Sequence, residues 1–458
     1  MYDLVIIGAG PAGIYAAYEA IKINKKAKIL IIEKGNTLEK RVCPQVVNPK
    51  INCINCPSCA IMNGFGGAGA FSDGKYNITN EFGGNLYSYI GYQQATELME
   101  YVDEINMNYL KSKKIKLFDS NHNHKLSTLA MQHDLKLLAA KVRHLGTDNN
   151  YLLLEAMYKD LNKHTKMLFN SKVIAITKEK YFQVKYLSKN KEHEVTAKNI
   201  ILATGRSGSE LVVDVCEHFN IELTSTKVDL GVRVEIPAQV FEHITKEVYE
   251  GKFVYKTKRY SDLVRTFCMN PNGVVVTENV DGVITVNGHS YSDDHKKTKN
   301  TNFALLVAHN FTEPFNNSFE YGKAIARLSN MLGGGVIVQQ FGDLIKGQRS
   351  TASRMAKGFV KPTLNATPGD LSLVLPKRCL DNIIEMIYAL NNIAPGVAND
   401  STLLYGVEVK FYNSCIKLDQ DMQTHVKGLY ILGDCSGITH SLSHASASGI
   451  YVARKIFN

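Results

Sequence analysis

The sequence predicts an α/β protein in which a parallel sheet lies between two layers of helices and a second, α+β domain is inserted. Two stretches predict the sheet: an apolar run followed by glycines at residues 4–17, and a similar run at residues 426–437. A strand, a glycine turn and a helix in this order are the unit of parallel sheets. Between the stretches, residues 228–236, 274–278 and 282–286 alternate in polarity, as antiparallel strands do.

The first glycine motif, GAGPAG at residues 8–13, predicts a dinucleotide site. Gly8 allows a tight turn, Gly10 lets a pyrophosphate approach the backbone, and Gly13 lets the helix pack close to the strand. The free N–H groups at the start of that helix attract an anion. The next predicted strand ends in Glu33, whose carboxylate can bind the ribose hydroxyls of an adenosine.

Composition sets the broad class of protein. The chain has 458 residues, of which 45% are hydrophobic and 21% charged, as expected for a globular protein of two domains. We find no apolar run of membrane-spanning length, and the N-terminus lacks the basic region and cleavage site of a signal peptide. We therefore expect a cytoplasmic protein without a membrane partner. The net charge of +10 comes from scattered lysines, which indicates a solvated surface rather than a nucleic-acid site.

Four of the nine cysteines lie close together: Cys43, Cys53, Cys56 and Cys59. In a cytoplasmic chain, this density favours metal or redox chemistry over structural disulfides. The spacing allows four thiolates to bind zinc or an Fe–S cluster. A thiol–disulfide relay and free cysteines that only pack remain the alternatives.

Further elements follow from periodicity and turn residues. A glycine-rich segment over residues 63–75 can lie flat against a planar or anionic ligand. Gly333 to Gly335 follow a predicted helix over residues 321–332, so we interpret them as a C-cap or loop. The pattern also predicts helices over residues 93–111, 131–145, 151–164 and 444–457, and a hairpin of 167–177 with 181–187.

These motifs together resemble the FAD-binding fold of the glutathione-reductase-like flavoproteins. Residues 203–205 (ATG) match the middle motif of that family, and residues 428–434, which end in Gly433 and Asp434, match its second FAD motif. More narrowly, the chain resembles a group of uncharacterised prokaryotic FAD-dependent dehydrogenases. The segments that carry this resemblance are residues 41–44, 53–59, 66–75, 143–148 and 286–288.

The resemblance implies a Rossmann-like, three-layer FAD-binding domain over residues 1–206 and 399–458, with an inserted α+β substrate domain over residues 207–398. The motifs and the resemblance together give the expected FAD contacts: Gly8, Gly10, Pro11, Ala12, Gly13, Glu33, Lys34, Arg41, Gly66, Gly67, Ser72, Asp73, Val173, Thr204, Gly205, Gly433, Asp434 and Ala445. In the second FAD motif, the aspartate typically binds the ribityl or ribose chain.

Two histidines and two arginines are candidates for chemistry beyond cofactor binding. His440 and His444 follow the second FAD motif four residues apart, and either could act as a general base near neutral pH. Arg349 and Arg354 of the insert could hold an anionic substrate, because guanidinium groups bind carboxylates well.

We therefore expect an FAD-dependent oxidoreductase that uses tightly bound FAD for two-electron transfer with a small-molecule substrate. NAD(P)H is a candidate electron donor, and an Fe–S cluster would instead pass single electrons to a redox carrier. A flavin-dependent RNA-modifying enzyme and a non-catalytic flavin redox sensor are the alternatives.

Overall fold

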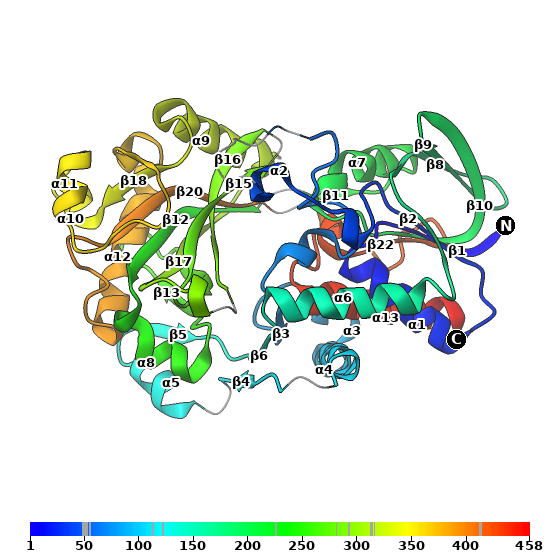
Figure 1. The fold of residues 1–458 in the computed structure, drawn as a ribbon, viewed down its shortest axis with the longest axis horizontal. Helices are drawn as coiled ribbons and strands as arrows, with labels where there is room; N and C mark the ends of the chain where they lie inside the picture. Colours follow the sequence, from blue (N-terminus) through cyan, green and yellow to red (C-terminus); the bar gives the residue numbers. More distant parts are fainter. Residues whose placement is uncertain are drawn as a thin grey trace. The chain divides into compact units, whose positions relative to one another are not determined.

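The chain folds into two compact units, which are described one at a time (Figure 1). Unit 1 comprises Met1–Lys116, Arg143–Thr224 and Asn413–Asn458, and unit 2 comprises Leu117–Val142 and Ser225–Tyr412. The computed structural model describes residues 1–47, 54, 56–111, 114–120, 123–224, 227–280, 282–291, 294–311, 315, 317–411 and 415–458. The units differ from the expected division: unit 1 extends past residue 206 and resumes at 413, and residues 117–142 belong to unit 2.

Unit 1 is built on a mainly parallel sheet. Strands β7, β2, β1, β10 and β22 pair in this order, all parallel, and β9 and β8 continue the sheet from β10 as an antiparallel hairpin. The bounds are β1 Tyr2–Ile7, β2 Ile29–Ile32, β7 Lys166–Leu168, β8 Ser171–Lys178, β9 Phe182–Ser188, β10 Lys191–Leu202 and β22 Leu429–Ile431. β1 from Leu4 onward, β2 and β22 are buried along their length, which explains why these three segments are continuous apolar runs.

Two helices of unit 1, α1 (Pro11–Ile23) and α13 (Leu442–Phe457), pack directly against each other (Figure 1). A methyl group at Gly449 would lie 2.1 Å from the Ala12 carbonyl oxygen, so the close approach requires glycine. Unit 1 also contains β3 Lys75–Ile78, β11 Leu223–Thr224, β21 Cys415–Ile416, α2 Pro44–Val47, α3 Tyr87–Ile90, α4 Tyr92–Tyr109, α6 Thr147–Leu161 and α7 Ser209–His218. β6, Lys141–His144, spans the boundary between the units.

Unit 2 is built on an eight-stranded sheet in the order β19-β18-β20-β12-β17-β14-β13-β5, with a separate hairpin, β15–β16. The strands are β5 Leu135–Leu137, β12 Lys227–Pro237, β13 Phe253–Lys256, β14 Leu263–Asn270, β15 Val274–Val280, β16 Val283–His289, β17 Asn300–Asn310, β18 Ile337–Gln340, β19 Thr367–Pro368 and β20 Leu403–Phe411. β4, Leu117–Asp119, also belongs to this unit. The helices are α5 His124–Met131, α8 Ala238–Val248, α9 Ser318–Gly333, α10 Phe341–Ile345, α11 Ala352–Lys357 and α12 Lys377–Ile393.

The two faces of the unit 2 sheet differ in polarity. On β12, Val228, Leu230, Val232 and Val234 enter a hydrophobic core that α8 and α12 complete. Successive side chains of a strand point to opposite faces, so the intervening residues, from Asp229 to Glu235, lie on the other face, here called the polar face. The alternation that predicts these strands thus also separates the core from the polar face.

Most of the predicted elements are present, and one is wrong. The helices over residues 93–111, 151–164, 321–332 and 444–457 correspond to α4, α6, α9 and α13, and the residue after α9, Gly334, has a left-handed φ of 66°. Residues 131–145 are not a helix, because Leu135 and Leu137 alternate with Lys136 on β5, which pairs with β13. In the described part of the chain, no helix combines the length and apolar character that a membrane crossing requires.

Candidate functional site

The predicted nucleotide-binding residues come together at one edge of the unit 1 sheet. The glycine turn follows β1, Glu33 follows β2, Thr204 and Gly205 follow β10, and Gly433 and Asp434 follow β22. These four strands are parallel, so their carboxyl ends lie along the same edge. Ligands of α/β sheets bind at this edge.

The glycine turn has the geometry that the motif predicts. Gly8 has a φ of +103°, and a methyl group there would lie 2.3 Å from the Ala203 carbonyl oxygen. A methyl group at Gly13 would lie 2.2 Å from the Gly8 carbonyl oxygen, so the start of α1 packs tightly against the turn. At Gly10, in contrast, the nearest atom to such a methyl group is the Gly67 Cα at 4.0 Å. Gly10 therefore leaves space where a ligand can approach the backbone, and Pro11 occupies the first position of α1.

The second glycine-rich segment lies against the first. The Gly66 N–H donates to the Ala9 carbonyl oxygen at 2.8 Å, and a methyl group at Gly67 would lie 3.1 Å from the Gly10 Cα. A methyl group at Gly69 would lie 2.8 Å from a methyl carbon of Leu442, the first residue of α13. Gly66 and Gly67 thus border the turn that is expected to hold the phosphates.

Glu33 is buried and joins three loops. Its Oε2 accepts a hydrogen bond from the Ala9 N–H at 2.8 Å, and its Oε1 accepts from the N–H groups of Gly35 at 2.8 Å and Gly64 at 2.9 Å. A carboxylate can accept about four hydrogen bonds. Glu33 therefore shapes the site as well as offering an acceptor for ribose.

Arg41 differs from its expected role. Its guanidinium is buried and donates to the backbone carbonyl oxygens of Ala60, Ile61 and Phe65 at 2.6–2.9 Å. Burial lowers the pKa of Arg41 to about 10, although the nearby Glu33 opposes this shift. Through these contacts, Arg41 fixes the backbone of residues 60–65, between the cysteine segment and the glycine-rich segment. Lys34 similarly donates to the Ser207 carbonyl oxygen at 2.6 Å.

Four further residues that were expected to contact FAD, Thr204, Gly205, Val173 and Ala445, lie on three separate segments of unit 1. Thr204 packs against Gly208, where a methyl group would lie 2.2 Å from the Thr204 Cβ. Gly205 has a φ of +62°, and no atom lies within 4 Å of the position of its missing Cβ. Val173 is buried on β8, opposite Tyr186 of β9, and Ala445 is buried in the first turn of α13.

The carboxylate of Asp434 contacts two side chains, those of His440 and Arg206. Its Oδ1 lies 2.8 Å from His440 Nδ1, and its Oδ2 lies 3.0 Å from Arg206 Nε. A methyl group at Gly433 would lie 3.3 Å from the Ala12 Cβ, so the second motif does meet the start of α1. His440 is thus oriented by a carboxylate, which is the arrangement of a positioned acid–base group.

His444, in contrast, is fully buried. Its Nε2 is 2.8 Å from the Thr79 carbonyl oxygen, to which it donates. Burial lowers the pKa of His444 to about 4, more than the Thr79 hydrogen bond raises it. His444 is therefore neutral near pH 7 and held in place by its surroundings, which argues against the expected role as a general base near neutral pH.

The buried neutral His444 predicts a loss of stability in mild acid. The unfolded side chain takes up a proton below its ordinary pKa of 6.5, whereas the folded one does so only near pH 4. Stability should be complete above pH 6.5 and fall as the pH drops to 4, by about 3 kcal/mol. Urea unfolding between pH 7 and 4 would measure this, and His444→Asn should flatten the profile whereas His193→Asn, at an exposed position, should not. An unchanged slope in His444→Asn would contradict the assignment.

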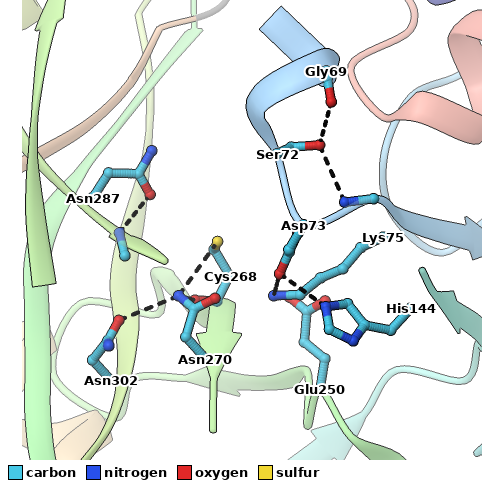
Figure 2. A network of polar contacts seen from close by, with 12 residues as sticks. Gly69, Ser72, Asp73, Lys75, His144, Glu250, Cys268, Asn270, Asn287 and Asn302 are labelled. Atoms are coloured by element: carbon cyan, nitrogen blue, oxygen red, sulfur yellow. Dashed lines mark hydrogen bonds and ion pairs between the residues drawn. The ribbon is translucent and has the colours of Figure 1, made fainter. Parts of the chain in front are cut away.

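A further polar cluster lies directly after the glycine-rich segment (Figure 2). The Asp73 Oδ2 lies 3.2 Å from Lys75 Nζ and 3.4 Å from His144 Nε2, and all three side chains are mostly buried. Ser72 holds the preceding turn, because its Oγ donates to the Gly69 carbonyl oxygen and accepts from the Gly74 N–H. His144 was not among the sequence candidates. It is distant from Asp73 in the sequence, so only the fold could pair them.

The cysteine segment is described in part. Cys43, Cys56 and Cys59 are partly exposed free thiols, whereas Cys53 lies outside the described residues. Within the described part of the chain, no three His, Cys, Asp or Glu side chains are grouped to hold a metal ion. The four-cysteine site therefore stays a prediction.

The unit 1 site fits a dinucleotide in two respects. Gly10 provides a cradle that any larger residue would fill. In addition, buried polar atoms in and just before α13 have no hydrogen-bond partner within the described residues, namely Thr439 Oγ1, Ser443 Oγ, Ser446 Oγ and His444 Nδ1. Buried polar groups normally have partners. A polar ligand at this end of α13 would supply them.

One protein-family model matches part of the chain. Residues 227–411, most of unit 2, match the family described as FAD-dependent protein, C-terminal domain-like. The recognition of an FAD-dependent family from the sequence is confirmed for this segment, and the match supports an FAD-dependent oxidoreductase. No curated protein matches the chain.

Solved structures resemble the chain only in outline. A quinol fumarate reductase from E. coli is 13% identical with a TM-score of 0.42, and the match covers 100% of this chain and 70% of that one. A glycine oxidase from Geobacillus kaustophilus is 10% identical with a TM-score of 0.42, over 99% and 94%. A p-nitrophenol 4-monooxygenase from Pseudomonas putida is 10% identical with a TM-score of 0.39, over 100% and 79%. These values carry no argument about activity or substrate.

Proposed function

We propose that this chain is an oxidoreductase that holds FAD along the carboxyl edge of the unit 1 sheet and exchanges two electrons with a small-molecule substrate. The observation that carries the proposal is the cradle at Gly10, between the first turn of α1 and Gly67. The family match of residues 227–411 supports the same cofactor. FAD, when bound, supplies the redox chemistry at its isoalloxazine ring.

Different residues of unit 1 are proposed to bind different parts of FAD. The backbone N–H groups of the first turn of α1 would bind the pyrophosphate, and the helix dipole would add to their attraction for it. Glu33 would accept a hydrogen bond from the ribose, while Arg41 and Lys34 hold the surrounding loops in place. The buried hydroxyls of Thr439, Ser443 and Ser446 are available to the polar part of the flavin.

Two histidines in unit 1 can hold or move a proton. His440 is oriented by Asp434 at 2.8 Å, and His144 is oriented by Asp73 at 3.4 Å. A carboxylate beside an imidazole fixes the orientation of the ring. We propose these two pairs, in place of His444, as the acid–base groups that accept the substrate proton when the substrate is oxidised.

The histidine assignment predicts a selective loss of rate. With a substrate that reduces the bound flavin, His440→Gln or His144→Gln should slow reduction by about 10²- to 10⁴-fold, because a positioned acid–base group contributes that much. His193→Gln, at an exposed position on β10, is the matched control and should change the rate less than twofold. FAD content, read from the visible spectrum, should be equal in all variants. Equal rates in all of them would contradict the assignment.

The cofactor itself is tested on freshly purified protein under anaerobic conditions. We expect a flavin spectrum, and chromatography of the released flavin should identify FAD rather than FMN. Protein that carries no flavin and takes up none from added FAD would overturn the proposed function. Addition of NADH and NADPH in the same cell would show whether either one is the electron donor.

The cysteine segment adds a second redox candidate. We retain Cys43, Cys53, Cys56 and Cys59 as the proposed ligands of an Fe–S cluster or zinc, with a thiol relay as the alternative. Iron and zinc analysis of the same anaerobic sample tests this. An iron–sulfur absorption shoulder would support transfer of single electrons to a carrier, whereas a metal-free sample would remove the metal site.

A further inference from the structure

The part of unit 2 that links β18 to β19, and contains α10 and α11, concentrates positive charge (Figure 1). Between Asp343 and Asp370 the sequence has five basic residues and no acidic one, which accounts for half of the net charge of +10. No other stretch between two successive acidic residues contains more than four basic residues. Residues 346–361, here called the basic segment, hold all five, and each is exposed: Lys346, Arg349, Arg354, Lys357 and Lys361.

The backbone of the basic segment is anchored by buried residues. Met355 and Val360 pack in a small hydrophobic core with Val338 of β18. Ser350 is also buried, and its Oγ donates to Asp343 Oδ2 at 2.7 Å. The exposed lysines and arginines alternate with these buried residues, so the fold presents their charges at defined positions on the surface of unit 2.

Two of the five cations have an acidic partner. Lys346 Nζ lies 2.9 Å from Asp400 Oδ2, and Arg354 Nη1 lies 3.5 Å from Asp343 Oδ1. Lys346 and Asp400 are both exposed, so water and salt screen their attraction. Five cations and two carboxylates leave a net charge of +3.

The other three cations have no acidic partner within the described residues. Lys361 Nζ donates to the backbone carbonyl oxygens of Ala356 and Gly358 at 3.1 and 2.9 Å. The side chains of Arg349 and Lys357 make no hydrogen bond or ion pair in the described part of the chain. These cations can therefore meet an anion from outside the chain without breaking an existing ion pair.

Exposed apolar side chains accompany the cations. Phe359 is 59% exposed, although its neighbours in the chain, Gly358 and Val360, are buried. Ile345, directly before Lys346, is 44% exposed. Apolar side chains gain free energy when they leave water for a lipid surface. Stacking on nucleic-acid bases needs a ring, which Ile345 lacks, so the two side chains together fit lipid better than single-stranded RNA.

We propose that the basic segment binds the surface of membranes that contain anionic lipids, with Phe359 inserted among the headgroups. Lysines and arginines around an aromatic anchor are the composition of peripheral membrane surfaces. Each basic side chain near such a surface contributes about fivefold to the affinity. The contact differs from the sequence-based expectation of no membrane partner, and it gives Arg349 and Arg354 lipid phosphates in place of an anionic substrate. FAD is not needed for it, so its test is independent of the proposed function.

Sedimentation of the purified full-length protein with vesicles tests the proposal. One set of vesicles contains only phosphatidylcholine, and the other also contains about 30% phosphatidylglycerol, an anionic lipid. We expect at least tenfold tighter binding to the anionic vesicles. This binding should be lost when the salt concentration rises from about 0.1 M to 1 M, which shortens the Debye length from about 10 Å to 3 Å. Anionic vesicles that bind no better than neutral ones would overturn the proposal, and binding of polyuridylic acid would then identify a nucleic-acid surface instead.

Charge variants locate the contact. Arg349→Gln combined with Lys357→Gln removes two cations without acidic partners, so binding to anionic vesicles should weaken at least tenfold. Arg349→Lys combined with Lys357→Arg should retain it. The matched control is Lys246→Gln combined with Lys258→Gln, two exposed lysines elsewhere in unit 2, and its affinity should stay within twofold. Both glutamine pairs lower the net charge by two, so an equal loss in both would overturn the assignment to the basic segment.

Phe359→Trp tests the insertion. The chain contains no tryptophan, so the emission of this variant reports the surroundings of position 359 alone. Anionic vesicles should shift the emission to shorter wavelength, because the indole leaves water. Leu263→Trp, at an exposed position of β14, is the control and should show no shift. Emission of Phe359→Trp that does not change when the vesicles bind would overturn the insertion of Phe359.

Discussion

Gly10→Ala should abolish tight FAD binding without destabilising the apoprotein. Gly10 has a φ of −81°, which alanine adopts freely, and the nearest atom to the added methyl group is 4.0 Å away. The unfolding free energy of the apoprotein should therefore stay within about 0.5 kcal/mol of the wild type. The methyl group would stand where the pyrophosphate approaches the backbone, so FAD affinity should fall at least a hundredfold, or about 2.7 kcal/mol.

Gly13→Ala is the informative comparison. Its methyl group would meet the Gly8 carbonyl oxygen at 2.2 Å, so the start of α1 must move away from the turn. We expect a loss of about 1–3 kcal/mol in stability together with the loss of FAD, as in other overpacked sites. Urea unfolding of the apoproteins and FAD titration followed by flavin fluorescence measure both quantities. If Gly10→Ala binds FAD normally, the cradle does not hold the cofactor.

Arg233→Met should destabilise unit 2 by about 3–5 kcal/mol, since it leaves a buried carboxylate without its partner. Arg233 is completely buried and donates to both oxygens of Glu408 at 2.7 and 2.9 Å. It also donates to the Asn302 and Asn287 side chains and to the Cys268 carbonyl oxygen. Burial raises the pKa of Glu408, although Arg233 opposes this, so the carboxylate depends strongly on the guanidinium.

The effect should be local and recoverable. Hydrogen exchange, measured by mass spectrometry, should speed up in peptides of β12 and β20 while peptides of β1 keep their protection. The double variant Arg233→Met with Glu408→Gln should recover part of the loss, because it removes the unpaired charge. Arg327→Met is the control, since Arg327 forms an exposed ion pair with Glu320, and its cost should stay below about 0.5 kcal/mol. A similar small cost for Arg233→Met would show that the network is dispensable.

The polar network around Arg233 illustrates how the fold arranges residues that no motif singles out. A methyl group at Gly288 would lie 2.1 Å from the Asn302 side-chain oxygen and 2.4 Å from an Arg233 nitrogen. Figure 2 shows Asn302 directed towards Asn270, whose amide also donates to the Cys268 carbonyl oxygen at 2.9 Å. These residues come from β12, β14, β16 and β17, so the cluster exists only once the strands are paired.

The sequence by itself predicts those features of this protein that depend on interactions between residues close together in the chain. The glycine turn at Gly8 to Gly13 and the acid at Glu33 need only a strand, a turn and a helix in order, and all are found where the pattern predicts them. The alternation along β12 likewise identifies the core face, because side chains of a strand point to opposite sides at every second residue. The helix expected over residues 131–145 is wrong because the pairing of β5 with β13 overrides a short apolar pattern.

Tertiary structure alone decided what the charged residues do. Arg41 follows the nucleotide motif, where a phosphate contact is plausible, yet folding brings three carbonyl oxygens to its guanidinium. The position of His444 after the second FAD motif suggests a general base, yet the side chain is buried and its pKa falls to about 4. Backbone motifs are read from neighbouring residues, whereas the charge state and partners of a side chain depend on burial and on distant segments. The sequence therefore predicts the cradle of the cofactor, and only the fold identifies the residues around it that carry charge and protons.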